Sequence, residues 1–307
     1  MKQSAPFPTA TPEAATLTAT TVKPRFADFV ALTKPRVNAL VAMTTFGGFY
    51  LGSSTGLDLV RMINAVAGTW LVAASAAALN QAIERDTDAL MVRTRRRPLP
   101  DGRLQSGAAI SFAILIGVAG LAELAASSNL LAAGVALATL IVYVAIYTPL
   151  KRYSSVSTLV GGIAGGLPPV IGWATARNSL AAEAWALFAI VFLWQMPHFL
   201  AIAWLCREDY ARAGFPFLPV IETDGRSTGA QVVLYAAVLV PVSLLPSILG
   251  ATGPVYFAAA LLAGGAFLAV AVSFARSRTR AAARHLFLGS ILYLPIVWLV
   301  MLVDKVG

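Results

Sequence analysis

The sequence has few of the residues on which soluble domains rely. Charged residues make up 12% of its 307 residues, against about 25% in a typical soluble domain. There is a single cysteine, Cys206, which excludes an internal disulfide and a metal cage built from several cysteines. Histidine is also scarce, with only His198 and His285. The scarcity of charge excludes a soluble fold for most of the chain.

Hydrophobic residues, by contrast, make up 58% of the chain and gather in long runs. About 20 apolar residues span a bilayer as a helix, and these runs lack the period-two alternation of a membrane β-barrel. The sequence therefore predicts an all-α, polytopic membrane bundle of nine transmembrane helices. The predicted spans are 37–55, 62–83, 106–126, 130–149, 156–175, 183–204, 230–250, 255–275 and 285–303. Tight turns are expected at 126–129 and 250–254.

The net charge of +9 is explained by membrane topology, and no nucleic acid is expected as a partner. With nine spans and the N-terminus inside, only Arg61, Arg177 and Lys305 of the 23 Lys and Arg residues fall on the outer side. This asymmetry predicts an inner N-terminus and an outer C-terminus. Residues 1–27 are predicted to be a disordered cytoplasmic tail, and residues 28–307 to form one intramembrane domain.

Three oxygen-bearing side chains lie four residues apart where the second span reaches the inner side. Asn80, Glu84 and Asp88 would form one stripe of a helix, and such ligands suit Mg²⁺ bound together with substrate phosphates. The basic side chains that follow would hold phosphate oxygens; they are Arg93, Arg96 and Arg97. The alternative is a solvated, salt-bridged loop, although polar groups at membrane depth usually have a function.

A second acidic cluster lies where the sixth span ends. Glu208 and Asp209 follow Arg207 at the predicted inner face. If the two acidic clusters face each other across one cavity, a cation is needed to offset their repulsion. We therefore expect the two clusters to hold a diphosphate through metal ions.

Two tyrosines precede a basic pair at the inner end of the fourth span. Tyr143 and Tyr147 are one helical turn apart, and Lys151 and Arg152 follow. One interpretation is an aromatic belt with cations that extend toward the interface. The other is that the cations bind a diphosphate while the aromatic faces stabilise a carbocation. In the next span, the Gly- and Pro-rich run 161–169 predicts a broken helix beside a cavity.

Taken together, these motifs are similar to those of the heme O synthases, a branch of the UbiA superfamily of intramembrane prenyltransferases. The resemblance covers roughly residues 28–304. It rests on Leu32-Thr-Lys-Pro-Arg36, Asn80-x3-Glu84-Arg-Asp-x-Asp88, Tyr147-Thr-Pro-Leu-Lys151-Arg152, Gly165-Gly-x-Pro-Pro-x-x-Gly-Trp173, Trp194-Gln-x-Pro-His198-Phe and Asp209-Tyr-x-x-Ala-Gly214. The chain departs from the superfamily pattern at Glu84 and Cys206, where Asp is usual.

The resemblance implies a UbiA-like bundle around a central cavity in the cell inner membrane, with the active site at the cytoplasmic face. It implies an Mg²⁺-dependent enzyme that transfers a farnesyl group from farnesyl diphosphate to a vinyl group of heme B and forms heme O for terminal oxidases. Heme A synthase or terminal oxidase assembly factors are the expected protein partners. Another UbiA-type aromatic prenyltransferase and, in a different class, a transporter are the alternatives.

The resemblance also assigns roles to individual residues. It implies that Asn80, Glu84 and Asp88, joined by Glu208 and Asp209, bind metal, and that Tyr147 and Lys151 act in catalysis. The implied diphosphate ligands are Arg93, Arg96, Arg97, Lys151, Arg152 and Arg207. The implied heme contacts are Arg36, Trp194, Gln195 and His198. For His198 two interpretations remain open, a core histidine beside the break at Pro197 or an axial ligand of the heme iron.

Overall fold

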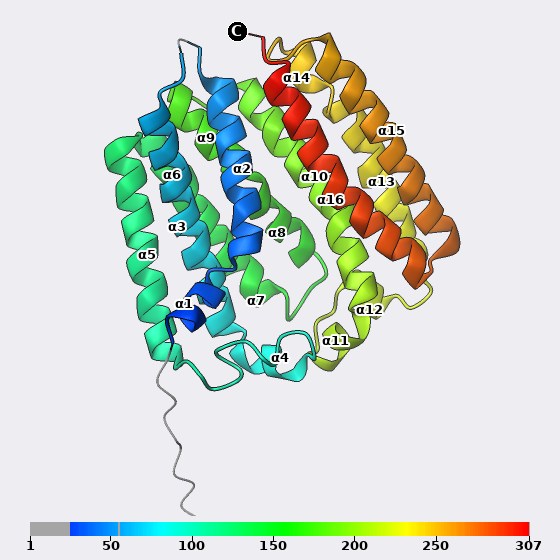
Figure 1. Cartoon of the computed structure of the whole chain (residues 1–307). Coiled ribbons are helices and arrows are strands. Elements are labelled where there is room, and N and C mark those ends of the chain that lie inside the picture. Colours follow the sequence, from blue (N-terminus) through cyan, green and yellow to red (C-terminus); the bar gives the residue numbers. More distant parts are fainter. Residues whose placement is uncertain (1–24, 55, 307) are drawn as a thin grey trace, which may run out of the picture.

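Long helices form the framework of the protein. The computed structural model describes residues 25–54 and 56–306. Within them there is no strand, only one bridge between Thr252 and Lys305. The long helices run side by side, and several short helices gather at one end of the bundle (Figure 1). The predicted tail lies outside the described residues as far as residue 24.

The helices follow the chain in the order of their labels in Figure 1. They are α1 (Phe26–Leu32), α2 (Pro35–Gly52), α3 (Leu59–Ile83), α4 (Arg85–Leu90), α5 (Ser106–Ser127), α6 (Leu130–Ile141), the π-helix η1 (Val142–Tyr147), α7 (Thr148–Leu150), α8 (Ser157–Gly166), α9 (Pro168–Arg177), α10 (Ala182–Leu205), α11 (Arg207–Arg212), α12 (Leu218–Ile221), α13 (Arg226–Val242), α14 (Leu245–Ile248), α15 (Pro254–Ser277) and α16 (Arg280–Val303).

The prediction of an all-α, polytopic membrane protein is confirmed. Eight helical segments of the described chain are long and apolar enough to cross a membrane, and they coincide with eight of the predicted spans. The remaining span, 37–55, coincides with α2, an 18-residue helix that packs against α9 but is not among the eight. The number of nine spans and the orientation of the bundle stay predictions.

The predicted turns and the predicted helix break are present. Asn129 ends the turn between α5 and α6, and its side-chain oxygen accepts a hydrogen bond from the N–H of Ala132 at 2.8 Å. This contact caps α6, because the first N–H groups of a helix have no partner within it. Leu167 separates α8 from α9, and Pro168 is the first residue of α9. Proline fits this position because it has no N–H to leave unpaired.

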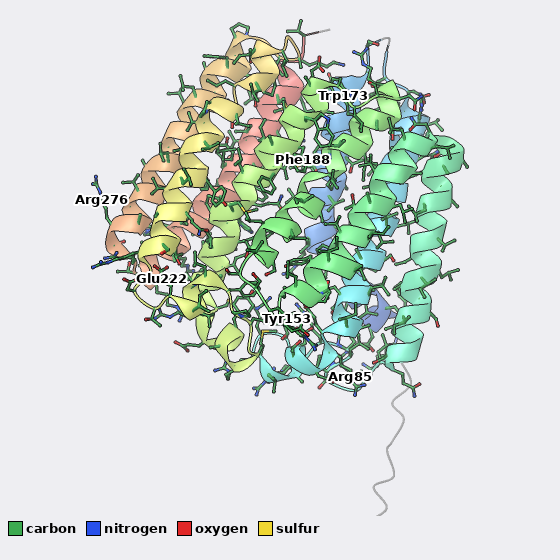
Figure 2. The ribbon with its side chains drawn as sticks, turned by 180° about the vertical axis from the view of Figure 1, so that it is seen from behind. Arg85, Tyr153, Trp173, Phe188, Glu222 and Arg276 are labelled. Atoms are coloured by element: carbon green, nitrogen blue, oxygen red, sulfur yellow. The ribbon has the colours of Figure 1, made fainter. Side chains whose placement is uncertain are left out.

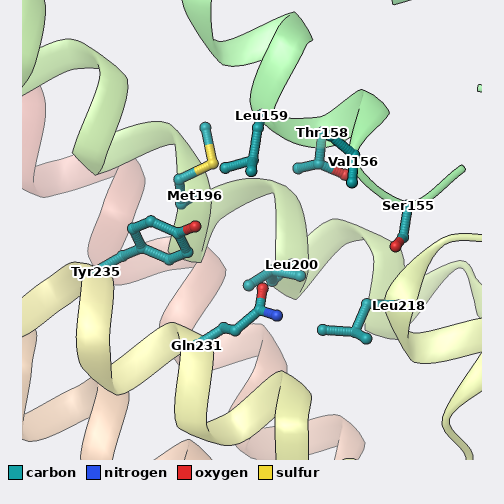
Figure 3. Close-up of a pocket in the computed structure, with 9 residues that line it drawn as sticks. All are labelled: Ser155, Val156, Thr158, Leu159, Met196, Leu200, Leu218, Gln231 and Tyr235. Atoms are coloured by element: carbon teal, nitrogen blue, oxygen red, sulfur yellow. The ribbon is translucent and has the colours of Figure 1, made fainter. Parts of the chain in front are cut away.

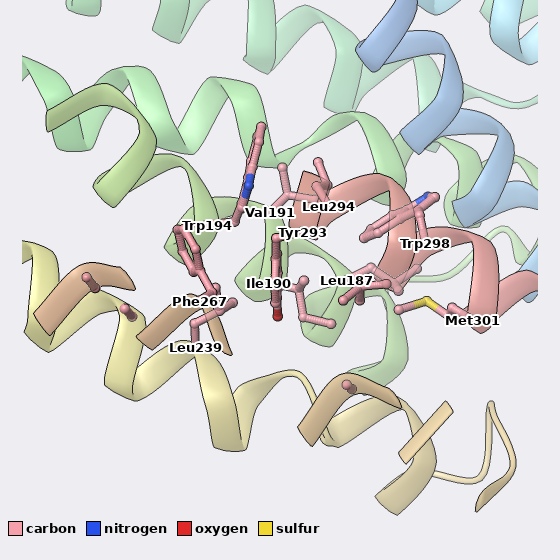
Figure 4. Packing of buried hydrophobic residues seen from close by; sticks show 14 of the residues in the cluster. Leu187, Ile190, Val191, Trp194, Leu239, Phe267, Tyr293, Leu294, Trp298 and Met301 are labelled. Carbon is pink, nitrogen blue, oxygen red and sulfur yellow. The ribbon is translucent and has the colours of Figure 1, made fainter. Parts of the chain in front are cut away.

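A large apolar core holds the second half of the bundle together. Figure 4 shows residues of α10, α13, α15 and α16 that interdigitate around Ile190, Tyr293 and Trp298. A polar contact within this core is satisfied, since the hydroxyl groups of Ser243 and Tyr293 lie 2.6 Å apart. Such packing fixes α10 and α16 relative to each other.

The first half of the bundle relies on glycines at its helix contacts. Gly172 of α9 faces the backbone of α2 at Thr45 and Phe49, and Gly48 of α2 faces the backbone of α9 at Pro169. Without side chains at these positions, the two helices approach closely, which is the usual basis of helix packing in membranes. The contact places α2 beside the cavity described below.

The short helices α1, α4, α7, α11 and α12 mark the end of the bundle where the charged motifs lie, whereas α14 lies at the opposite end (Figure 1). Arg85, Tyr153 and Glu222 all lie toward this end, whereas Trp173 lies at the other (Figure 2). The described chain starts at this end with α1, and α16 finishes at the opposite end (Figure 1). Loops predicted for the inner membrane side therefore contribute residues to one end of the bundle.

The close approach of α2 and α9 generates a stability prediction. Gly172→Ala places a methyl group against the backbone of α2, and overpacking of this kind destabilises proteins by about 1–3 kcal/mol. We expect a lower midpoint of thermal unfolding in detergent. Gly134→Ala and Gly265→Ala are matched controls, because a Cβ there meets nothing within 4 Å. They should be neutral or stabilise by up to about 1 kcal/mol. Equal midpoints for all three variants would contradict this account of the contact.

Candidate active site

The three side chains predicted to bind metal lie together at the end of the bundle where the short helices gather. Asn80 belongs to the last turn of α3, Glu84 joins α3 to α4, and Asp88 belongs to α4. Their exposed fractions are 1%, 4% and 1%. The predicted single helix is interrupted at Glu84. However, the backbone N–H of Glu84 donates a hydrogen bond to the carbonyl of Asn80 at 3.0 Å, and the N–H of Asp88 donates one to the carbonyl of Glu84 at 2.7 Å.

Because the four-residue hydrogen-bond spacing survives the junction, the three side chains still share one side. All three line a single polar chamber of about 530 Å³. Asp86, two residues away from both acids, is exposed. The predicted stripe is thus continuous in space although it crosses two helices.

Each of the three side chains contacts one basic side chain from another part of the chain. The ammonium of Lys34 donates to Asn80 Oδ1 at 3.1 Å. The ammonium of Lys151 lies 2.5 Å from Glu84 Oε1, and Arg97 Nη1 lies 2.7 Å from Asp88 Oδ2. These three contacts are called the oxygen–cation cluster below. Buried carboxylates require such partners, because an unpaired charge is strongly disfavoured away from water.

Lys34 is a member of the cluster to which the sequence analysis gave no role. Its backbone has φ 46°, in the left-handed region, immediately before Pro35 at the start of α2. Two amide side chains brace this turn: Asn38 donates to the carbonyl of Thr33 and Gln81 to that of Leu32, each at 2.7 Å. Burial, followed by the nearby cations Arg97 and Lys151, lowers the pKa of Lys34 to about 7.

The polar chamber adjoins a larger apolar chamber of about 910 Å³. The residues that line both are Lys34, Tyr143 and Tyr147. The apolar chamber is formed mainly by small and aliphatic side chains of α2, α3 and α8; they include Val37, Val41, Ala73, Ala76, Ala77, Gly161, Ala164 and Gly165. A charged group and a long apolar group of one molecule would therefore find adjacent compartments.

The two tyrosines at this junction are presented by the π-helix η1. Their ring centroids lie 5.0 Å apart, and the Lys151 ammonium lies 4.6 Å from the centroid of the Tyr147 ring. Gly161 of α8 makes room for this ring, because a Cβ at that position would lie 2.7 Å from its Cε2 atom. Short π-helical segments are frequent at functional sites, and the sequence pattern did not predict this one.

Residues of two loops close the polar chamber. Arg93, from the segment after α4, lines it together with three aromatic residues from α11 and the segment after it; these are Tyr210, Phe215 and Phe217. Arg93 Nη2 donates to Tyr210 Oη at 3.4 Å, and its Cζ atom lies 5.9 Å from the Tyr210 ring centroid. Burial raises the pKa of Tyr210, which keeps its hydroxyl protonated. The aromatic residues were not among the predicted site residues.

Several predicted site residues lie outside both chambers. Arg36, Arg96, Arg207 and Glu208 are exposed. The Cζ atom of Arg207 lies 5.0 Å from the Trp204 ring centroid. Arg152, also exposed, donates to the carbonyl of Ile83 at 3.4 Å. Of the predicted diphosphate ligands, only Arg93, Arg97 and Lys151 line the polar chamber.

The predicted heme contacts on α10 divide into two groups. Gln195 lines the apolar chamber. Trp194 and His198 instead face α16: Trp194 Nε1 donates to the Ser290 carbonyl at 2.7 Å, and His198 Nδ1 lies 2.8 Å from Ser290 Oγ. The His198 ring stacks between those of Trp194 and Phe287, with centroids at 5.1 and 5.2 Å. These contacts favour the interpretation of His198 as a core residue.

A further pocket of about 470 Å³ is lined by residues of α8 and α10 that do not line the apolar chamber. Figure 3 shows Thr158 and Leu159 of α8 on one side, Gln231 and Tyr235 of α13 on the other, and Met196 and Leu200 of α10 between them. None of its lining residues is acidic or basic. It therefore lacks the groups that a diphosphate needs.

Comparisons with known proteins show the family and the fold of the chain. The UbiA prenyltransferase family matches residues 41–295. The chain is 46% identical to a protoheme IX farnesyltransferase of Solibacter usitatus, over 91% of this chain and 99% of the relative. It is 42% identical to one of Koribacter versatilis, over 91% and 93%.

Solved structures show the same fold. One described as digeranylgeranylglyceryl phosphate synthase has a TM-score of 0.77 at 17% identity, over 91% of this chain and 97% of that one. A UbiA homolog from Archaeoglobus fulgidus, bound to GPP and Mg²⁺, has a TM-score of 0.64 at 17% identity, over 89% and 99%.

The ion pair of Lys151 with Glu84 generates a prediction about stability. Lys151→Met leaves the Glu84 carboxylate buried without its partner, and the loss of one member of such a pair destabilises by about 3–5 kcal/mol. Glu84→Gln, added to Lys151→Met, should restore part of the lost stability because it removes the stranded charge. Thermal unfolding in detergent measures both effects.

The matched control is Arg152→Met, which removes an exposed cation beside Lys151 and should change the stability by less than about 0.5 kcal/mol. Unfolding of Lys151→Met at the wild-type temperature would show that the pair does not contribute to stability.

Proposed function

The chain belongs to the UbiA prenyltransferase family, and from this premise we propose that it transfers a farnesyl group from farnesyl diphosphate to a vinyl group of heme B. The product is heme O, with a hydroxyethylfarnesyl side chain. The proposal is supported by relatives at 41–46% identity that are named protoheme IX farnesyltransferase. The single structural observation that carries it is the oxygen–cation cluster at the junction of a polar and an apolar chamber.

The residues of the cluster fit a divalent cation. Asn80, Glu84 and Asp88 offer oxygen ligands, and two of the three side chains are buried carboxylates. Mg²⁺ prefers such hard ligands. We propose that these three residues hold Mg²⁺. When bound there, the cation would neutralise charge on the diphosphate oxygens and so make the diphosphate a better leaving group. Glu208 and Asp209 are not part of this proposal, because neither lines the chamber.

The basic residues of the polar chamber would bind the diphosphate directly. Lys151, Arg97 and Arg93 line the chamber with the acids. Guanidinium and ammonium groups form strong, charge-assisted hydrogen bonds with phosphate oxygens. Charge that develops on the departing diphosphate is stabilised by donors that are already in place. Exposed Arg96, Arg152 and Arg207 are assigned no contact with it.

The apolar chamber would hold the farnesyl chain. Breaking the bond between C1 of farnesyl and the diphosphate oxygen leaves an allylic cation at the junction, where Tyr143 and Tyr147 lie. Aromatic faces attract cations, and the apolar walls keep water away until the new bond has formed. The terminal carbon of the heme vinyl group attacks C1. Water then adds to the resulting carbocation and releases a proton, which leaves the hydroxyl group.

The remaining assignments concern the prenyl acceptor, the membrane location and the protein partners. Gln195 is retained as a heme contact, because it lines the apolar chamber. The relatives at 41–46% identity favour heme B over a quinone precursor or a chlorin, and no observation favours a transporter. The protein is a multi-pass membrane protein. We propose the cell inner membrane as its location, a cytoplasmic-face active site, and heme A synthase or terminal oxidase assembly factors as partners.

The proposed metal site predicts which substitutions abolish the reaction. Glu84→Gln and Asp88→Asn each remove one negative charge from the cluster, and metal-assisted stabilisation of several kcal/mol corresponds to a loss of about 100-fold or more. Farnesyl transfer is measured in membranes that contain normal protein levels, by mass analysis of the extracted hemes. Removal of divalent ions by a chelator should abolish the reaction, and Mg²⁺ should restore it.

Asp86→Asn is the matched control. It makes the same chemical change on the same short helix, but the side chain is exposed, so the activity should stay within about twofold of wild type, as is usual for surface substitutions. Undiminished transfer by both Glu84→Gln and Asp88→Asn would remove the assignment of the metal site.

A further inference from the structure

Asp209 makes a contact that neither the metal site nor the fold of its own helix explains. It lies in the first turn of α11, and its carboxylate accepts hydrogen bonds from the backbone N–H groups of Val92 and Arg93, each at 3.3 Å. Arg212, one turn further along α11, forms an ion pair with the same carboxylate. The contact joins two segments 116–117 residues apart in the sequence. α4 and α11 lie next to each other at this end of the bundle (Figure 1).

We propose that Asp209 is a positioning residue, which holds residues 91–93 across the polar chamber and thereby places Arg93 for diphosphate binding. These three residues are called the roof segment below. The role of Arg93 in this statement rests on the proposed function. The role of Asp209 as the anchor of the roof segment does not depend on it.

The geometry of Arg93 supports this role. Its backbone N–H bonds to Asp209, while its guanidinium donates to Tyr210, the next residue of α11. Two adjacent residues of α11 therefore fix both ends of Arg93. Met91, Arg93 and Tyr210 all line the polar chamber, whereas Asp209 does not. Loss of the Asp209 contact should free the roof segment and, with it, one cation of the chamber.

The chemistry of the contact favours an anchor over a metal ligand. Both carboxylate oxygens of Asp209 accept backbone N–H groups, and Oδ1 also pairs with Arg212. Hydrogen bonds to an ionised acceptor are about twice as strong as neutral ones. The side chain of Asp209 is 14% exposed, so this network is partly shielded from water. The sequence-based expectation of a second metal ligand at Asp209 is replaced by this assignment.

The contact can be broken from either side. Asp209→Asn removes the charge and replaces one accepting oxygen by a donor. Val92→Pro removes one donating N–H without a change of charge, and proline is compatible with the preceding residue because Met91 is already extended, with φ −96° and ψ 132°. Asp224→Asn is the control: Asp224 is an exposed acid of a nearby loop whose partner is Arg226.

The first measurement does not depend on catalysis. Trypsin is added to the full-length protein in membranes whose short-helix face is accessible, and cleavage after the exposed Arg95 and Arg96 is followed by fragment mass. We expect cleavage about tenfold faster in Asp209→Asn and in Val92→Pro, because proteolysis tracks the population of the open segment. The double variant should be cleaved no faster than about twofold above the faster single variant, because both changes break one contact. The Asp224→Asn control should match wild type.

The second measurement separates an anchor from a metal ligand. An anchor predicts for Asp209→Asn a KM for farnesyl diphosphate about tenfold higher and a half-saturating Mg²⁺ concentration within about twofold of wild type, in keeping with the loss of one well-placed phosphate contact. Wild-type cleavage rates in both single variants would overturn the proposal. So would a half-saturating Mg²⁺ concentration that rises while the cleavage rate stays unchanged. If the wild-type protein transfers no farnesyl group, the proposed function fails, but the trypsin result still decides the role of Asp209.

Discussion

The rest of the structure depends on the oxygen–cation cluster, in which three buried oxygen ligands each contact one buried or half-buried cation. Carboxylates at the edge of a membrane bundle are tolerated only when they are paired. The pairs here join Lys34, residues 80–88, Arg97 and Lys151. Four separate segments must therefore converge at one end of the bundle. The packing of the helices brings these segments together.

The packing of the apolar helices leaves a chamber beside the oxygen–cation cluster. Glycines let α9 approach α2 and let α8 approach Tyr147, while the core between α10 and α16 engages Trp194 and His198. What remains between α2, α3, η1 and α8 is a chamber with few polar groups that begins where the cluster ends. A molecule with a charged head and a long apolar tail fits these two neighbouring compartments, and farnesyl diphosphate has this form. Residues of two loops close the charged end, and Asp209 connects them.

The sequence predicted the parts of this structure that follow from local patterns. Eight spans, the turn capped by Asn129 and the break before Pro168 all follow from apolar runs and from Gly, Pro and capping residues. The stripe of Asn80, Glu84 and Asp88 followed from helical spacing, which survived a helix junction that the pattern did not predict. The sequence predicted that distant motifs meet in one site, but it did not predict the individual contacts between them. In the sequence, Lys34 cannot be distinguished from an ordinary interfacial lysine. Its contact with Asn80 depends on the backbone turn before Pro35. Likewise, Tyr210 and Asp209 gain their roles only from the roof segment, and His198 from Ser290 of α16. The π-helix at Tyr147 has no local pattern by which it could have been predicted.

The most direct test of the central claim is the position of a bound metal ion. The structure would be determined with Mn²⁺ in place of Mg²⁺ and with a farnesyl diphosphate analogue in which sulfur replaces the oxygen between C1 and phosphorus. The anomalous scattering of Mn²⁺ would locate the ion. We predict a peak in the polar chamber, about 2.1 Å from oxygen atoms of Asn80, Glu84 and Asp88, which is the ligand distance of Mg²⁺, with the diphosphate between it and Lys151. A bound analogue with its metal ion elsewhere, or with no metal ion beside the three side chains, would contradict the account.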